Sequence, residues 1–345
     1  MFRQRPTRVV LGALCLVLAL SACRFQAYGN APVEASADSG VAWLKTVQQP
    51  DGGFEVAGFP GFETPDAVLA IASAAQTTYT WNKATARNAV LATVKNGNTP
   101  LDALDDFAQS GLDAGQAAKL ITLVTVPLGL SSTAFDPEGD GAQNLVGTVD
   151  AGLLPNGSYG LFGGTLSAAI AKKALGATVP AAAVAYIKGA QQANGGWSYT
   201  GLAGGTDLDV DTTAAAVQAL IAAGVPITDA DLNQGLAFLA NRQRPTGSWQ
   251  SFGSDDPNST STAVLAITAA GFNVELPCWR NTVAPGLAAN PYGNPLNWLR
   301  FSQTPSGRFV SPNDPFGVNT FATSQAVEGL QRNWVPIAPF APRTC

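Results

Sequence analysis

Small apolar residues recur at helical spacing along most of the chain. Val217, Leu220 and Ile221, for example, stand at positions i, i+3 and i+4 of an alanine-rich segment. This spacing places them on one face of a helix. Similar segments alternate along the chain with others that carry larger apolar and aromatic residues. The pattern therefore predicts an all-α protein in which two kinds of helix take turns.

A repeated turn punctuates this pattern. An apolar–aromatic–Leu/Ile run leads into a Gln- or Arg-containing turn with Pro, Asn or Gly, and each turn ends on an aromatic residue: Phe54, Trp197, Trp249 and Phe309. Each turn precedes a small-residue helix, predicted over 63–75, 211–224, 259–271 and 319–330. Asp, Ser or Thr residues stand ahead of these helices, where N-caps are expected.

Two weaker copies fill the middle of the chain. Helices are predicted over 84–97 and 112–126, and a second pair over 142–160 and 165–177. Six helix pairs with a period of 40–60 residues indicate a repeat array. We expect one domain over residues 40–335, followed by a tail over 336–345.

The composition limits the chemistry. The chain has 345 residues, is 46% hydrophobic and 12% charged, and contains no histidine. The lack of histidine excludes Ser-His-Asp and Cys-His catalysis and histidine-ligated zinc. Residues 1–22 contain three arginines and no acid, so the remainder carries a net charge of −8 against −5 for the whole chain. That charge argues against a nucleic-acid partner.

The first residues are typical of a targeting segment. Three arginines precede the apolar stretch 9–20, which is too short to span a bilayer. The sequence Leu-Ser-Ala-Cys at 20–23 resembles the lipobox of bacterial lipoproteins. The resemblance implies a signal peptide over 1–22, a lipid on Cys23 and a tether over 23–39. It also implies export, with the protein anchored to the outer face of the cytoplasmic membrane or within the cell envelope.

Two further cysteines remain after lipidation of Cys23 and loss of the signal. In an oxidising compartment, Cys278 and Cys345 are expected to form a disulfide. Two free thiols are the alternative.

The repeated turns resemble those of the terpenoid cyclase and protein prenyltransferase superfamily over residues 40–335. This resemblance implies an α/α toroid, in which six inner helices surround a central cavity and six outer helices enclose them. It also implies that a glutamine caps each outer helix and stacks on the turn aromatic. That role is carried to Gln49, Gln192, Gln243 and Gln303.

Asp207, Asp209 and Asp211 admit two interpretations. Residues 209–214, Asp-Val-Asp-Thr-Thr-Ala, resemble the Asp-Val-Asp-Asp-Thr-Ala motif of squalene–hopene-type cyclases, except that Thr212 replaces the third acid. The resemblance implies that Asp211 protonates an alkene and that Asp209 raises the pKa of Asp211. In the alternative interpretation Asp211 caps the fourth inner helix. Capping is favoured here, because small polar residues precede the other inner helices and those helices contain few aromatic residues other than Phe321.

Other functions of toroid proteins find less support. The chain has no Cys-Gly-Glu-Gln thioester and no β domain to close over a cobalamin. Paired carboxylates leave a polysaccharide-degrading toroid open. Residues 136–141, Asp-Pro-Glu-Gly-Asp-Gly, hint at a calcium loop, but glycine stands where an EF-hand needs glutamate, so a solvated turn is expected.

The interpretation that follows is a monomeric, lipid-anchored binding module without metal or cofactor. Its ligand, a small molecule, glycan or protein, would sit at the mouth formed by inner-helix N-termini. The predicted rim consists of Asp66, Asp207, Asp209, Asp211, Thr212, Asp255, Asp256 and Asn319. A cyclase that uses Asp211 is the alternative, followed by a polysaccharide-active toroid or a structural envelope protein.

Overall fold

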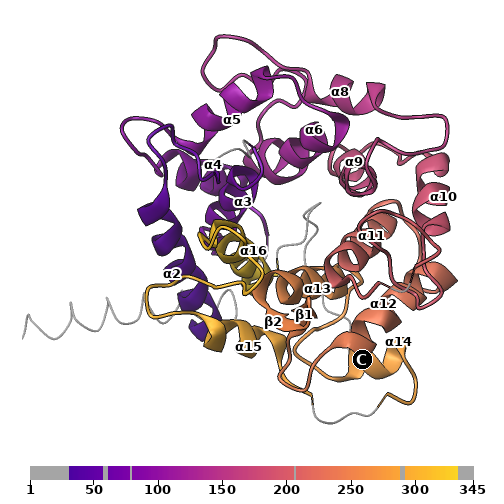
Figure 1. Ribbon diagram of the computed structural model, residues 1–345. Helices are drawn as coiled ribbons and strands as arrows, with labels where there is room; N and C mark the ends of the chain where they lie inside the picture. The colour runs from indigo at the N-terminus through magenta and orange to yellow at the C-terminus, as the bar shows by residue number, and fades with distance from the viewer. Residues whose placement is uncertain (1–30, 57–60, 78–79, 206, 288–291, 333–345) are drawn as a thin grey trace, which may run out of the picture.

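A computed structural model describes residues 31–56, 61–77, 80–205, 207–287 and 292–332. Its helices form two concentric rings (Figure 1). The inner ring consists, in chain order, of α3 (Thr64–Ala74), α6 (Ala114–Leu120) with its continuation η1 (Ile121–Thr125) and α7 (Val126–Leu128), α9 (Phe162–Ala174), α11 (Val210–Ala222), α13 (Pro257–Ala269) and α16 (Thr320–Gln331).

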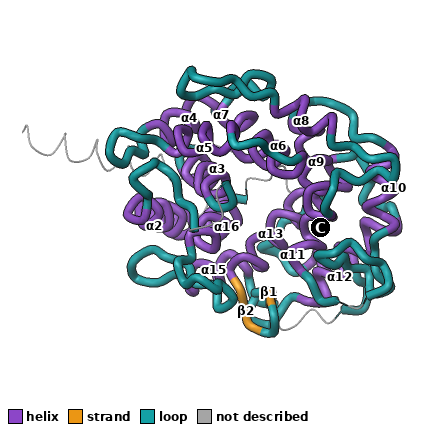
Figure 2. Tube along the Cα trace, turned by 45° about the horizontal axis from the view of Figure 1, so that its top comes forward, coloured by secondary structure: helices purple, strands orange, loops and turns teal. Residues whose placement is uncertain are grey.

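The outer ring packs around these helices. It consists of α2 (Ala31–Val47), α4 (Lys83–Leu91) and α5 (Pro100–Gln109), α8 (Leu145–Ala151), α10 (Ala181–Gly189), α12 (Ala230–Arg242), and α14 (Cys278–Val283) with α15 (Pro295–Ser302). The view in Figure 2 shows the loops that join the two rings.

The inner ring is closed. Each inner helix packs against the next one in the chain, and α16 returns to pack against α3. The interior faces of these helices are rich in alanine, and Ala70, Ala168, Ala216 and Ala266 are fully buried. Small side chains let neighbouring helices approach closely. The predicted all-α toroid in a single domain is confirmed.

One hydrogen bond recurs where a turn meets its inner helix. In five repeats, the backbone N–H of the turn aromatic donates to a threonine hydroxyl near the start of the helix, at 2.9–3.1 Å. The pairs are Phe54 with Thr64, Tyr159 with Thr165, Trp197 with Thr213, Trp249 with Thr260, and Phe309 with Thr323. The bond satisfies a buried donor and fixes the turn against the helix.

The glutamine prediction was wrong by one position in two repeats. Gln243 and Gln303 each donate to the glycine carbonyl four residues on, at 3.3 and 2.8 Å. The side chains that make this bond in the other two turns are Gln48 and Gln191, at 2.9 and 2.8 Å, rather than their neighbours. The role falls to the glutamine six residues before the turn aromatic, and adjacent glutamines hid that spacing.

One boundary and one added element also differ from the prediction. The first outer helix begins at Ala31, and Val33 and Ala37 are buried, so the predicted tether over 23–39 overlaps the folded domain. A short hairpin, β1 (Trp249–Ser251) and β2 (Ser254–Asp256), precedes α13. Its turn residues, Phe252 and Gly253, have φ of 45° and 86°, as a type I′ turn requires.

The N-terminal prediction lies outside the described residues, and so do the tail and Cys345. Of the residues that the structure does describe, no helix is long and apolar enough to cross a membrane. Cys278 begins α14, and its disulfide with Cys345 stays a prediction.

Candidate functional site

The start of α11 decides which aspartate caps the helix. The helix begins at Val210, and the side chain of Asp209 accepts hydrogen bonds from the Thr212 N–H at 2.9 Å and from its hydroxyl at 2.6 Å. Asp209 is therefore the N-cap. The prediction that Asp211 caps this helix was wrong. Asp211 lies in the first turn and is free for another role.

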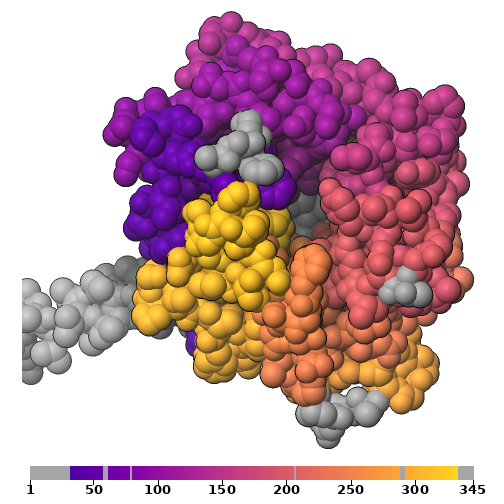
Figure 3. Space-filling model, in the orientation of Figure 1, coloured from indigo at the N-terminus to yellow at the C-terminus, as the bar shows by residue number. Residues whose placement is uncertain are grey.

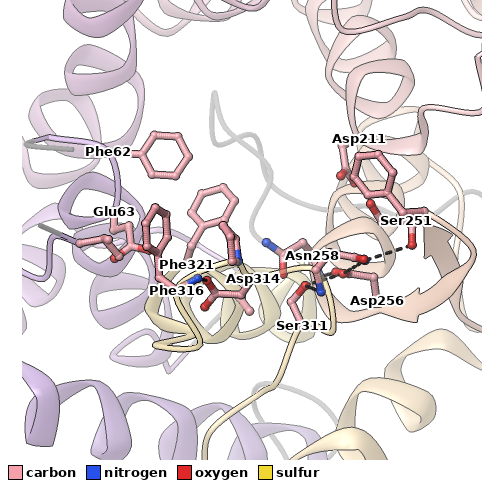
Figure 4. Close-up of a pocket in the computed structure, with 15 residues that line it drawn as sticks. Phe62, Glu63, Asp211, Ser251, Asp256, Asn258, Ser311, Asp314, Phe316 and Phe321 are labelled. Carbon is pink, nitrogen blue, oxygen red and sulfur yellow. Dashed lines mark hydrogen bonds between the residues drawn. The ribbon is translucent and has the colours of Figure 1, made fainter. Parts of the chain in front are cut away.

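Asp211 lies on the wall of a cavity of about 380 Å³ near the centre of the toroid (Figure 4). The space-filling view is hollowed between α16 and α11 (Figure 3). The Thr262 hydroxyl on α13 donates to Asp211 Oδ1 at 3.1 Å. This contact holds the carboxyl group in place from the neighbouring inner helix.

The surroundings of Asp211 favour its neutral form. The pKa of Asp211 is raised from 3.8 to about 6, chiefly by burial and also by the carboxylates of Asp209 and Asp256, against a lowering by the Ser259 and Thr262 hydroxyls. At pH 7, roughly one molecule in ten then carries the proton on this group. Asp211 is consequently an acid whose strength suits proton transfer in a weakly acidic to neutral medium.

Four phenylalanines line the same cavity: Phe62, Phe252, Phe316 and Phe321. The rings of Phe62 and Phe321 lie 5.0 Å apart between centroids and are tilted by 32°. The cavity therefore has more aromatic residues than the inner helices by themselves supply. Three of these residues stand in loops ahead of inner helices, so an inspection of the helices alone finds only Phe321.

Glu63 is a cavity acid that the sequence analysis missed. It precedes α3, makes no capping hydrogen bond with its side chain, and is only 5% exposed. The pKa of Glu63 is raised from 4.5 to about 7, chiefly by burial and also by the carboxylates of Glu55, Asp314 and Asp66. Its Oε2 has no hydrogen-bond partner among the described residues. Glu63 and Asp211 lie on opposite sides of the cavity (Figure 4).

Asp256 also borders the cavity but is fully engaged. It caps α13 by accepting from Asn258 N–H at 2.7 Å. Its Oδ2 accepts from the Ser311 hydroxyl at 2.5 Å and from the Asn313 amide at 3.0 Å. With these partners it holds the loop after α15 against α13, which is a structural role.

Asp66 does not line the cavity but is linked to its phenylalanines through Lys119. It is buried and pairs with Lys119 at 2.6 Å. The Lys119 ammonium lies 4.8 Å from the Phe62 ring centroid and 5.6 Å from that of Phe321. Glu328 belongs to the same cluster. Burial and the nearby Asp66 charge raise the pKa of Glu328 well above its ordinary value. Lys119 therefore contacts both rings while it pairs with Asp66.

The other predicted rim residues do not line the cavity. Asp207 is exposed and lies 3.5 Å from the Gln192 amide. Asp255 is half-buried and faces the Thr246 hydroxyl. Asn319 accepts from Ser311 N–H at 2.7 Å. Of the predicted rim, only Asp211 and Asp256 border the cavity. A paired-carboxylate site for polysaccharides is disfavoured, because Asp209 and Asp256 are both bound in caps.

No family model matches the chain, and comparison with curated proteins finds no relative. Its fold is that of solved type II terpene cyclase structures. Type II terpene cyclase MstE from Scytonema matches without ligand at TM-score 0.59 and 17% identity, covering 87% of this chain and 98% of that one. An arginine-to-alanine variant of MstE in complex with its substrate, geranylgeranyl dihydroxybenzoate, matches at TM-score 0.60 and 16% identity, covering 87% and 97%.

A third structure, an aspartate-to-alanine variant of MstE in complex with the product merosterolic acid A, matches at TM-score 0.59 and 17% identity, covering 87% and 96%. The chain thus has a terpenoid cyclase-like α/α-toroid fold. Identity at this level shows the fold alone and leaves the chemistry to the site.

Proposed function

We propose that this protein is an acid-initiated cyclase or isomerase of polyprenyl compounds, with Asp211 as the proton donor. The observation that carries the proposal is a carboxyl group with a raised pKa on the wall of a phenylalanine-lined cavity. The cyclase-like toroid supports it. It replaces the binding module as the preferred function, because the cavity combines aromatic rings with an acid whose pKa is raised.

The chemistry begins with transfer of the Asp211 proton to one carbon of an alkene. The π electrons form the new C–H bond, and the other carbon becomes a carbocation. A second alkene of the same chain attacks that cation, which closes a ring and moves the charge along the substrate. The faces of Phe62, Phe316 and Phe321 stabilise the moving charge by cation–π attraction, at about 0.5–2 kcal/mol each.

Glu63 is suited to end the reaction. Its ionised carboxylate accepts a proton from the carbon next to the last cation, and the C–H electrons form the product alkene. The Glu63 side chain lies across the cavity from Asp211, so the two ends of the reaction are separated in space (Figure 4). With Asp211 required protonated and Glu63 ionised, activity is greatest between their pKa values of about 6 and about 7.

Export and anchoring fit this chemistry. We propose that residues 1–22 are removed and that a lipid on Cys23 holds the protein at the outer face of the cytoplasmic membrane or within the envelope. A polyprenyl substrate partitions into the bilayer, so an anchored enzyme meets it there. The support is the lipobox-like sequence at 20–23.

The test is product analysis with geranylgeranyl-bearing aromatic and simple polyprenyl substrates. Wild type is expected to form a cyclised isomer, and Asp211→Asn to lose about 10²–10⁴-fold in rate, because an amide cannot donate the proton. Asp207→Asn, an exposed change ahead of the same helix, serves as the matched control and retains the rate. Glu63→Gln is expected to change the product mixture, because the last cation must lose its proton elsewhere.

A ligand that binds in the cavity and is returned unchanged by wild type would restore the binding-module function. Product formed equally by wild type and Asp211→Asn would remove Asp211 as the donor.

A further inference from the structure

A second acidic cluster lies far from the cavity, where the loop 129–144 passes α5. This loop is ordered by its own contacts. Asp136 Oδ1 accepts from the N–H groups of Gly139 at 2.8 Å, Asp140 at 2.9 Å and Gly141 at 3.3 Å. Two backbone hydrogen bonds of 2.9 Å join the buried Phe135 to Gln143 and close the loop. The segment 136–141 is therefore a loop ordered by its own hydrogen bonds.

Three carboxylates converge at this loop. Asp105 comes from α5, and Glu138 and Asp140 come from the loop, with one oxygen of each within 4.8 Å of the others. The Glu138 N–H donates to Asp105 Oδ2 at 3.1 Å, which fixes the loop to the helix. None of the ion pairs within the described ranges involves these acids. The negative charge is thus gathered without a protein cation.

Asp105 supplies an observation of a different kind. Its side chain is completely buried, and Oδ1 has no hydrogen-bond partner among the described residues. An unpartnered buried carboxylate oxygen costs several kcal/mol of desolvation, and native proteins rarely leave one. A positive ligand next to this oxygen would remove the cost.

We propose that Asp105, Glu138 and Asp140 bind a Ca²⁺ ion. Calcium takes six to eight oxygen ligands in flexible geometry, which matches carboxylates held by a loop, with water and backbone carbonyls completing the shell. Zinc favours Cys or His ligands, which this cluster does not contain. The ion would neutralise the cluster and tie the loop ahead of α8 to α5.

No local sequence motif reveals this site, because the ligand Asp105 lies 31 residues before Asp136, the first acid of the loop. The EF-hand motif takes its ligands from one segment of twelve residues, so a search for it misses a ligand that comes from another part of the chain. With three protein carboxylates and an open, exposed loop side, we expect a dissociation constant of roughly 10⁻⁴ to 10⁻³ M, in the range of extracellular modules.

Calorimetric titration of the EDTA-treated, purified full chain with CaCl₂ tests the proposal. Wild type is expected to bind one equivalent, and Mg²⁺ to bind at least about tenfold more weakly, because its regular octahedron fits a fixed loop less well. At a Ca²⁺ concentration 100 times the dissociation constant, the melting temperature is expected to rise by about 4 °C.

Three variants separate a site from a diffuse negative field. Glu138→Gln is expected to weaken binding at least about tenfold, because the amide is a neutral and poorer ligand. Asp106→Asn, an exposed change on α5 beside the cluster, removes the same charge without removing a ligand and is expected to weaken binding no more than about threefold. Asp105→Asn is expected to abolish binding while the metal-free protein melts no lower than wild type.

Equal weakening by Glu138→Gln and Asp106→Asn would overturn the site in favour of general electrostatic attraction. Failure of wild type to show saturable Ca²⁺ binding would overturn it outright. Neither outcome bears on the proposed cyclase activity, which uses the separate cavity at Asp211.

Discussion

Replacement of Asp211 by asparagine is expected to stabilise the protein above pH 6. The folded-state pKa of about 6 lies above the unfolded value of 3.8, so the folded protein binds this proton more tightly. Stability therefore falls as the pH rises from about 4 to about 6, as this half-buried group is forced to ionise. A difference of roughly two pKa units corresponds to a loss on the order of 2–3 kcal/mol.

Asparagine removes that loss. It stays neutral at every pH, keeps an oxygen for the Thr262 hydroxyl, and occupies the same volume. At pH 8 the variant should gain on the order of 2–3 kcal/mol over wild type, or about 4 °C in melting temperature for a chain of this size. At pH 4 the two proteins should melt together, because Asp211 is then mostly protonated.

The assay is thermal unfolding between pH 4 and pH 8, with Asp256→Asn as a matched control from the same cavity wall. Asp256 accepts from Ser311 and Asn313, and an asparagine nitrogen would face those donors. That control should lose about 1–3 kcal/mol at pH 8. A loss of stability in Asp211→Asn at pH 8 would refute the reasoning and make Asp211 a structural acceptor like Asp256.

Three further predictions concern single sites. Asp209→Ala should lower the free energy of unfolding by about 1 kcal/mol, because it removes the cap of α11, whereas Asp209→Asn should be nearly neutral. Chemical denaturation measures both variants, and equal losses of stability would argue against the cap. Cys23→Ser should move the protein from the membrane to the soluble fraction on fractionation, and an unchanged distribution would exclude the lipid anchor. Peptides joined through Cys278 and Cys345 should appear in mass spectra without reduction, and finding both as free thiols would exclude the disulfide.

The sequence predicted where α11 starts only to within two residues. Sequence places an N-cap within the run of aspartates, but it does not distinguish Asp209 from Asp211, because either leaves an acceptable helix start. Successive residues turn by about 100° around a helix, so a shift of two residues moves a side chain by roughly 200°. The contacts of α11 with α13 select the start, and with it the acid that faces the cavity.

The residues that line the cavity were also found only in part from the sequence. Phe321 was visible as an aromatic residue on an inner helix, whereas Phe62, Phe252 and Phe316 lie in loops whose course depends on the closed ring. The signal for Glu63 was slight: it is the acid at the first position of the predicted helix 63–75, close to Asp66, which the sequence analysis placed on the rim. Its raised pKa depends on burial, which a sequence does not display.

The periodicity of small apolar residues, the repeated turns and the capping residues by themselves determined an all-α array of six helix pairs, because these signals act within a few residues of the chain. The closed toroid was only implied by the resemblance of the turns to those of terpenoid cyclases. Tertiary structure alone decided which carboxyl groups meet water and which do not. Asp211 and Glu63 face one cavity, and Asp105 meets Glu138, only after the ring closes and loops from different repeats come together. Burial and charge proximity set the chemistry of these groups, and both depend on neighbours that are distant in sequence.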